Sequence, residues 1–169
     1  LKELRIESGT KTLKLGYNYY STNGLGEGLF YDCPLETLYL GRDLSYNNTK
    51  AYGYSPFFKD KNSITSVTIG NNVTKILDAE FNNFKSLKEL HIEDGTETLN
   101  LGRSDVTQMY GQDRGNGLFY YCPLETLYLG RDLSYNNTEA YGYSPFFNKN
   151  SITSVTIGNN VTKINSKAF

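Results

Sequence analysis

The stretch CPLETLYLGRDLSYNNT occupies residues 33–49 and recurs without a change at residues 122–138. A second stretch, SITSVTIGNNVTKI, fills residues 63–76 and recurs at 151–164, and the opening LKELRIESGT returns as LKELHIEDGT at 87–96. Residues 1–86 and 87–169 are therefore two copies of one block. Because even polar positions match, the identity indicates a recent duplication rather than a separate requirement for each side chain.

Each block divides into three shorter units. A unit opens with an apolar residue, two others, a second apolar residue, one other and a third apolar residue. The six units begin at Leu1, Leu35, Ile64, Leu87, Leu124 and Ile152. Alternate residues of a strand face opposite sides, so we expect Leu38 and Leu40 to point inward and Thr37 and Tyr39 to point outward.

One unit cannot bury its own apolar edge, so we expect the units to stack about 4.8 Å apart, the spacing of paired strands. Each unit also contributes one phenylalanine to the predicted core. These residues are Phe30, Phe57, Phe81, Phe119, Phe146 and Phe169.

The unit ITSVTIGNNVTKILDAEFNNFKS, at 64–86, resembles the BspA-like class of bacterial leucine-rich repeats. The pieces FYDCPL at 30–35, FYYCPL at 119–124 and AF at 168–169 resemble the closing part of that repeat. The resemblance implies a β-rich fold (α/β class by repeat type) with few or no helices. We expect one right-handed leucine-rich-repeat solenoid over residues 1–169, with six stacked coils in two three-coil blocks, 1–86 and 87–169. No polar capping unit is visible at either end, which predicts a fragment of a longer array.

Composition excludes several classes of function. The net charge of −1 gives no basic field for nucleic acid, and no run of eighteen apolar residues exists to insert into a membrane. With one histidine, two cysteines and one methionine, we expect no catalytic residue, no metal site and no cofactor. The single histidine, His91, corresponds to Arg5 in the first block and should be a solvated position on the outer face.

Three further residue pairs have structural rather than functional interpretations. Cys33 and Cys122 occupy equivalent positions three units apart, about 14 Å, whereas a disulfide needs Cα atoms within about 7 Å. We therefore expect two small buried thiols. The carboxylate pairs Glu36 with Asp43 and Glu125 with Asp132 are interpreted as surface acids rather than a catalytic pair.

The fifteen tyrosines are the most suggestive feature, because rigid aromatic side chains with a polar tip suit recognition surfaces. The candidate ligand-binding residues are Tyr39, Tyr46, Tyr52, Tyr54, Tyr128, Tyr135, Tyr141 and Tyr143. The alternative is that these tyrosines cover a half-exposed edge of the core and bind nothing.

The resemblance implies a non-enzymatic adhesion module of a bacterial cell-surface or secreted protein that recognises host or matrix proteins. Two alternatives stay open: glycan binding through the tyrosine-rich face, and a structural spacer. The sequence favours a monomer and does not identify the ligand. The resemblance implies an extracellular or cell-surface location.

Overall fold

The computed structural model describes residues 1–16, 28–30, 32–47, 55–57, 63–81, 84–102, 117–119, 122–138, 143–146 and 151–169. Within these residues the chain forms short strands joined by turns and contains no helix. Each repeat unit contributes one four-residue strand from its first apolar positions. These strands are β1 (Glu3–Ile6), β3 (Thr37–Leu40), β5 (Ser66–Ile69), β7 (Glu89–Ile92), β9 (Thr126–Leu129) and β11 (Ser154–Ile157). The prediction of a β-rich fold is confirmed.

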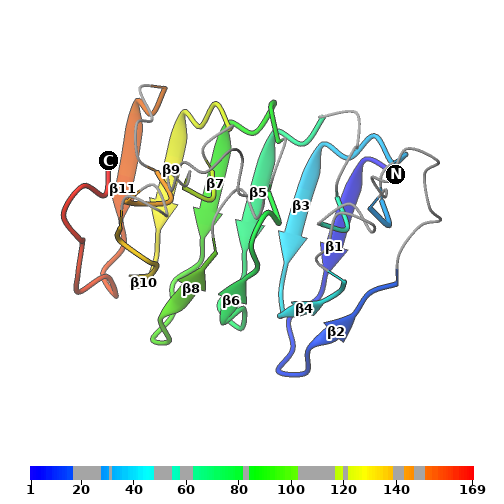
Figure 1. Ribbon diagram of the computed structural model, residues 1–169, viewed down its shortest axis with the longest axis horizontal. Helices are drawn as coiled ribbons and strands as arrows, with labels where there is room; N and C mark the ends of the chain where they lie inside the picture. The colour runs from blue at the N-terminus through cyan, green and yellow to red at the C-terminus, as the bar shows by residue number, and fades with distance from the viewer. Residues whose placement is uncertain are drawn as a thin grey trace.

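In the described part of the chain these strands form one six-stranded parallel sheet in the order β1-β3-β5-β7-β9-β11. They lie side by side from β1 near the N-terminus to β11 near the C-terminus (Figure 1). The register places equivalent positions opposite one another, so Leu38 has Leu4 on one side and Val67 on the other. Stacked repeat units produce this arrangement. The right-handed winding and the number of coils stay predictions.

The inner face of the sheet forms the core. Its two buried rows are Leu38, Val67, Leu90 and Leu127, and Leu40, Ile69, Ile92 and Leu129, each at most 2 % exposed. The predicted alternation is thereby confirmed. In β11, Val155 and Ile157 continue these rows but are 38 % and 45 % exposed, because β11 is an edge strand with a single neighbour.

Phenylalanine rings form a second part of the core. Phe81 and Phe119 stack with ring centroids 5.2 Å apart, and Phe119 and Phe146 stack at 5.5 Å. The predicted ladder omits Phe84, which packs edge-on against Phe57 at 6.1 Å and against Phe81 at 5.3 Å. Phe84 therefore packs between Phe57 of unit two and Phe81 of unit three, a contact that the predicted ladder of one ring in each unit does not include.

Shorter strands follow the long ones and lie near one end of them (Figure 1). Strand β2 (Leu13–Lys14) pairs with β4 (Leu44–Ser45). A three-stranded parallel sheet among the described residues contains β6 (Lys75–Ile76), β8 (Leu99–Leu101) and β10 (Leu133–Ser134). This second set of pairings keeps the units aligned beyond the main sheet.

Two aspartates from the repeated stretch join neighbouring units. Asp43 Oδ1 accepts the backbone N–H groups of Thr74 at 2.7 Å and Lys75 at 3.2 Å, and Oδ2 accepts the Thr74 hydroxyl at 2.6 Å. Asp132 makes the same three bonds to Thr162 and Lys163. Because these donors, the Thr162 hydroxyl above all, favour the ionised form, they lower the pKa of Asp132.

A buried arginine extends across a whole unit. Arg131 is 1 % exposed, and its guanidinium donates to the carbonyl oxygens of Gly70 at 2.8 Å and of Asn71 and Val73 at 2.9 Å. The side chain passes over Gly95, where a Cβ would lie 3.2 Å from Arg131 Cδ. Arg131 in unit five thus crosses unit four and holds the turn of unit three. Charge-assisted hydrogen bonds of this kind offset the lost hydration.

We expect Leu127→Ala to lower the free energy of unfolding by about 2–5 kcal/mol, because it removes a fully buried side chain from an inner strand. Its neighbour Thr126 faces outward, so Thr126→Ala should change stability by no more than about 0.5 kcal/mol. Urea unfolding of both variants checks this. Equal losses would contradict the observed alternation of the two faces.

Candidate binding surface

The outer face of the six-stranded sheet carries two rows of side chains. One row contains Glu3, Thr37, Ser66, Glu89, Thr126 and Ser154. The other, called the tyrosine row below, contains Arg5, Tyr39, Thr68, His91, Tyr128 and Thr156. The register brings Arg5 beside Tyr39 and His91 beside Tyr128, so the duplication presents one kind of pair twice. The two tyrosines are three strand spacings apart, about 14 Å.

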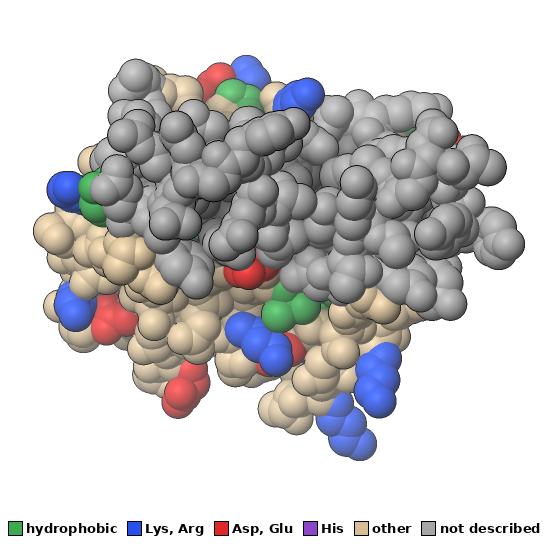
Figure 2. Space-filling view, in the orientation of Figure 1, with side chains coloured by type: hydrophobic (Ala, Val, Ile, Leu, Met, Phe, Trp, Pro, Cys, Tyr) green, Lys and Arg blue, Asp and Glu red, His purple; other side chains and the backbone are tan. Residues whose placement is uncertain are grey.

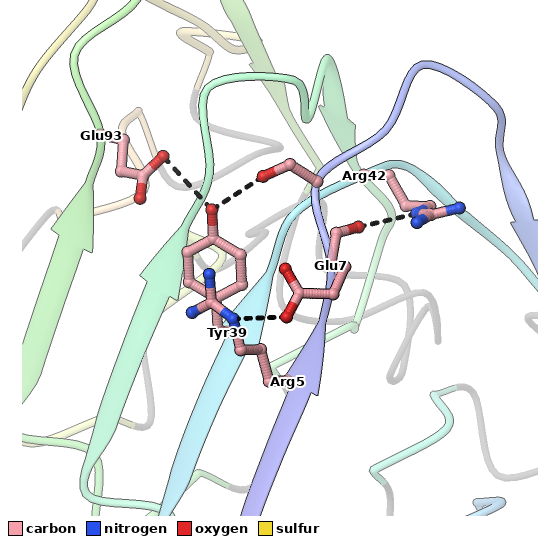
Figure 3. Close-up of polar contacts among 6 residues, drawn as sticks. Arg5, Glu7, Tyr39, Arg42 and Glu93 are labelled. Carbon is pink, nitrogen blue, oxygen red and sulfur yellow. Dashed lines mark hydrogen bonds and ion pairs between the residues drawn. The ribbon is translucent and has the colours of Figure 1, made fainter.

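The first pair is a cation–π contact held by further polar groups (Figure 3). The Arg5 guanidinium lies 3.9 Å from the centroid of the Tyr39 ring, and Arg5 Nε donates to Glu7 Oε1 at 2.9 Å. The Tyr39 hydroxyl lies 3.0 Å from the hydroxyl of Ser8 and donates to Glu93 at 3.5 Å. Polar contacts therefore hold both the ring face and the hydroxyl of Tyr39.

The second pair is a stacked one. The rings of His91 and Tyr128 are nearly parallel, with centroids 4.5 Å apart and an interplanar angle of 7°. The Tyr128 hydroxyl donates to the Asp94 carboxylate, at 2.9 Å from Oδ2 and 3.1 Å from Oδ1. This hydrogen bond favours the protonated phenol and raises the pKa of Tyr128.

A glycine lies beside each of these hydroxyls. A Cβ at Gly70 would lie 2.8 Å from the Tyr39 hydroxyl oxygen, and one at Gly158 would lie 3.0 Å from that of Tyr128. The glycine that ends the strand of the next unit therefore leaves room for the tyrosine to lean across the unit boundary. The surroundings of each tyrosine thus come from two units: the TLYLG sequence of one unit supplies the tyrosine, and the TIG sequence of the next supplies the glycine beside its hydroxyl.

Charge on the described surface is mixed in sign. In Figure 2 the described Lys and Arg side chains are interspersed with Asp and Glu side chains. At the margin of the sheet, Lys2 pairs with Glu36 at 2.6 Å and Lys88 with Glu125 at 2.9 Å, both in solvent. Such exposed pairs add little stability. At the tyrosine row, Arg5 lies beside Glu7 and the Tyr128 hydroxyl beside Asp94, so charges of both signs adjoin the aromatic rings.

Comparison with known proteins places the chain in a family. The family model described as BspA type leucine rich repeat region matches residues 53–102 and 110–169, in six copies. The chain belongs to the BspA type leucine-rich repeat family. Members of this family are repeat modules associated with protein interaction and bacterial surfaces, and generally not with catalysis. No curated protein and no solved structure matches the chain.

The other candidate tyrosines of this leucine-rich repeat chain lie elsewhere. Tyr46 and Tyr135 are half-buried and pack against the hydrophobic core. Tyr143 is half-buried, and Lys167 Nζ lies 3.8 Å from its ring centroid. Tyr52, Tyr54 and Tyr141 lie outside the described residues. Only Tyr39 and Tyr128 stand on the outer sheet face among the tyrosines that the structure describes.

Side chains with possible catalytic chemistry are engaged in structural contacts in the leucine-rich repeats. Glu36 and Glu125 pair with lysines, and Asp43 and Asp132 hold the turns of the following units. Cys33 and Cys122 form no disulfide with each other. Cys122 is buried as predicted, whereas Cys33 is half-buried and its predicted burial is wrong. Over the described ranges, no group of three or more His, Cys, Asp or Glu is arranged to hold a metal ion. Nor does this part of the chain contain a helix with the length and apolarity that a membrane crossing requires.

One buried acid of the leucine-rich repeats was not anticipated from the sequence. Glu80 is 2 % exposed, and its Oε2 accepts the Leu77 N–H at 2.9 Å. Burial raises the pKa of Glu80 to about 7. Tyr46 lies beside it, and burial followed by the neighbouring Glu80 charge raises the pKa of that phenol as well. The adjoining Ala79 has a φ of 58°, a left-handed conformation that turns the chain into this buried position.

We expect Glu80 to make stability depend on pH. The folded pKa, about 7, exceeds the ordinary value of 4.5, so its contribution is complete below pH 4.5 and is lost as pH rises through 7. The full difference corresponds to about 3 kcal/mol. In Glu80→Gln this loss should be absent, and the variant should gain stability relative to the parent chain between pH 5 and 8.

Urea unfolding at a series of pH values measures this difference, with the exposed Glu97→Gln as the matched control. Parallel pH profiles for the parent chain and Glu80→Gln would contradict the assignment of a buried, uncharged Glu80.

Proposed function

We propose that the chain is a non-enzymatic adhesion module of a bacterial cell-surface or secreted protein, and that it binds a host or matrix protein through the tyrosine row. The observation that carries this is the repeated pair, Arg5 with Tyr39 and His91 with Tyr128, on the exposed face of a rigid sheet. Family membership supports a role in protein interaction, and the row supplies a specific surface for it.

The two tyrosines are ready for binding before a partner arrives. Their hydroxyls are anchored by Ser8 and Glu93 in one case and by Asp94 in the other. Their rings are held by the neighbouring Arg5 and His91. A side chain that is already ordered loses little conformational entropy on binding, so its contact area contributes more fully to affinity.

Spacing favours an extended partner that crosses several strands. The pairs have the same orientation in the two blocks and lie about 14 Å apart. A protein segment or surface of that length would contact both pairs at once, and the second contact would form at high effective concentration. Between the two pairs lie Thr68 and the Ser66 of the adjoining row, which offer hydroxyl groups without adding charge.

A protein partner fits this surface better than a glycan does. Sugar rings bind tyrosine by lying flat on an open ring face, and one face of Tyr39 is covered by Arg5 while one face of Tyr128 is covered by His91. Of the tyrosine-rich segments on which the glycan alternative relies, Tyr46 and Tyr135 are packed on the core.

Screening against a panel of extracellular-matrix proteins and against a glycan array identifies a ligand. For a matrix-protein ligand, we expect the double variant Tyr39→Ser and Tyr128→Ser to lose affinity by at least about tenfold, because aromatic anchors dominate most interfaces. The matched variant Tyr39→Phe and Tyr128→Phe keeps both rings and should retain most of the affinity. Unchanged circular dichroism and melting must accompany each measurement.

Three results would overturn this assignment. Affinity that survives the serine variant but collapses in high salt would place binding on charged groups elsewhere. A glycan ligand would favour the glycan alternative. Absence of binding to either panel would favour the structural spacer.

A further inference from the structure

The two copies of the unit that contains β1 and β7 differ only at exposed positions. Residues 1–16 and 87–102 agree at twelve of sixteen positions, and every apolar residue is among the twelve. The remaining four positions are exposed in both copies. They are Arg5 and His91, Ser8 and Asp94, Lys11 and Glu97, and Lys14 and Asn100. The core of the unit has therefore been kept while four surface positions have changed.

Charge changes in the same direction at all four positions. Each residue of the second copy is less positive or more negative than its counterpart, with histidine counted as neutral. Residues 1–16 consequently carry four cationic and two anionic side chains, whereas residues 87–102 carry one cationic and four anionic side chains. Drift at exposed positions has no preferred sign of charge, so a common direction favours a change in the ligand chemistry of the unit.

Two of the four positions adjoin the first tyrosine. The Arg5 guanidinium lies 3.9 Å from the centroid of the Tyr39 ring, and the Ser8 hydroxyl lies 3.0 Å from that of Tyr39. Figure 3 shows Arg5 over this ring, with Glu7 beside the guanidinium. Below, the first tyrosine site means Tyr39 with Arg5 and Ser8, one cationic and one neutral neighbour.

The same two positions adjoin the second tyrosine. The His91 ring stacks on Tyr128 with centroids 4.5 Å apart, and Asp94 accepts the Tyr128 hydroxyl at 2.9 Å. The second tyrosine site means Tyr128 with His91 and Asp94, one neutral and one anionic neighbour. Glu7 and its counterpart Glu93 occur in both copies, so they do not cause the difference between the sites. Each site thus keeps a ring neighbour and a hydroxyl neighbour but changes their charge.

We propose that the two tyrosine sites bind opposite charges of one extended protein segment, an acidic side chain at the first site and a basic side chain at the second. This inference rests on the proposed function, because it specifies which protein segment fits the tyrosine row.

The groups at each site have donors and acceptors for these partners. A guanidinium has five N–H donors in a planar fork that matches a carboxylate, and Arg5 uses Nε for Glu7 while half of its side chain remains exposed. A carboxylate has about four lone-pair positions, and the exposed Asp94 accepts the Tyr128 hydroxyl with both oxygens. A Lys or Arg of the partner would bind to the remaining positions.

The distance between the sites determines the length of the segment. Three strand spacings separate the two tyrosines, about 14 Å, which exceeds the Debye length of about 8 Å at physiological ionic strength. Each site therefore acts on the charge directly above it. Because an extended chain advances about 3.3 Å per residue, about four residues should lie between the acidic and the basic side chain.

Immobilised synthetic peptides with a Thr-Val-Thr-Val centre test this charge preference at pH 7.5. The mixed peptide has Asp-Asp at one end of the centre and Arg-Arg at the other, the acidic peptide has Asp-Asp at both ends, and the basic peptide has Arg-Arg at both ends. A fourth peptide has the mixed ends and a single Thr as its centre. Surface plasmon resonance should show that the parent chain binds the mixed peptide at least about fivefold more tightly than the other three, the effect of one or two charge pairs.

Exchanging residues between the copies supplies the variants, because each residue is already accommodated at the equivalent position. His91→Arg with Asp94→Ser converts the second site into the first, so the preferred peptide should become the acidic one. Arg5→His with Ser8→Asp converts the first site into the second, so the basic peptide should be preferred. Glu97→Lys alters the charge of the unit as much as the first exchange but lies in the turn between β7 and β8, so it should keep the parent preference. Circular dichroism verifies folding.

The double variant Tyr39→Ser and Tyr128→Ser separates this inference from the proposed function. Mixed-peptide binding that is lost in the serine variant but unchanged by both exchanges would overturn the charge preference and leave the tyrosine row as the binding surface. Binding that survives the serine variant would overturn the proposed function and this inference with it. Equal binding of all four peptides, no binding to any of them, or a changed preference in Glu97→Lys would overturn the charge preference alone.

Discussion

Full burial of the inner side chains of the main sheet depends on each strand having a neighbour in register on both sides. Two identical sequences within the chain show how strongly burial depends on neighbouring strands. The SVTI of β5 and the SVTI of β11 have the same residues in the same pattern, yet Val67 is fully buried and Val155 is 38 % exposed. The difference lies in the neighbours, since β5 pairs on two sides and β11 on one. Burial is thus a property of adjacent units rather than of any unit alone, as expected for a repeat architecture.

Because burial and register depend on neighbouring units, a duplication can repeat the surface that we propose binds a partner. Copying a three-unit block copies the register as well, so a tyrosine that leans over the next unit's glycine in the first block does the same in the second. Other residues of the repeated stretch make contacts that stabilise neighbouring units. Asp43 and Asp132 fasten the next unit's turn, and Arg131 holds a turn two units away. These three residues follow the strands rather than lying on the outer sheet face, where we propose that recognition takes place.

Much of the fold could be predicted from the sequence, because the apolar spacing reports a local property. Alternation within a strand decides that Leu38 is buried and Tyr39 is not, and repetition decides which strands are neighbours. Features that depend on contacts between distant units could not be predicted in this way. Arg131 meets carbonyls 58–61 residues away, Phe84 fills a step between two rings, and Tyr46 turns inward beside Glu80. Of the candidate site, the outward direction of Tyr39 and Tyr128, both half-buried, follows from alternation. Their pairing with Arg5 and His91 requires the strand register, which the repeat alignment already contained.

The most direct test of the account is the distance between the two outermost strands of the sheet. Spin labels at Glu3→Cys and Ser154→Cys, in a Cys33→Ala and Cys122→Ala background, occupy the same outer row at β1 and β11 and point the same way. Pulsed electron double resonance on the dilute chain should give one narrow distribution centred about 24 Å apart, five strand spacings. A broad distribution, or a maximum displaced from this value by more than the reach of the labels, would contradict a single in-register sheet through both blocks.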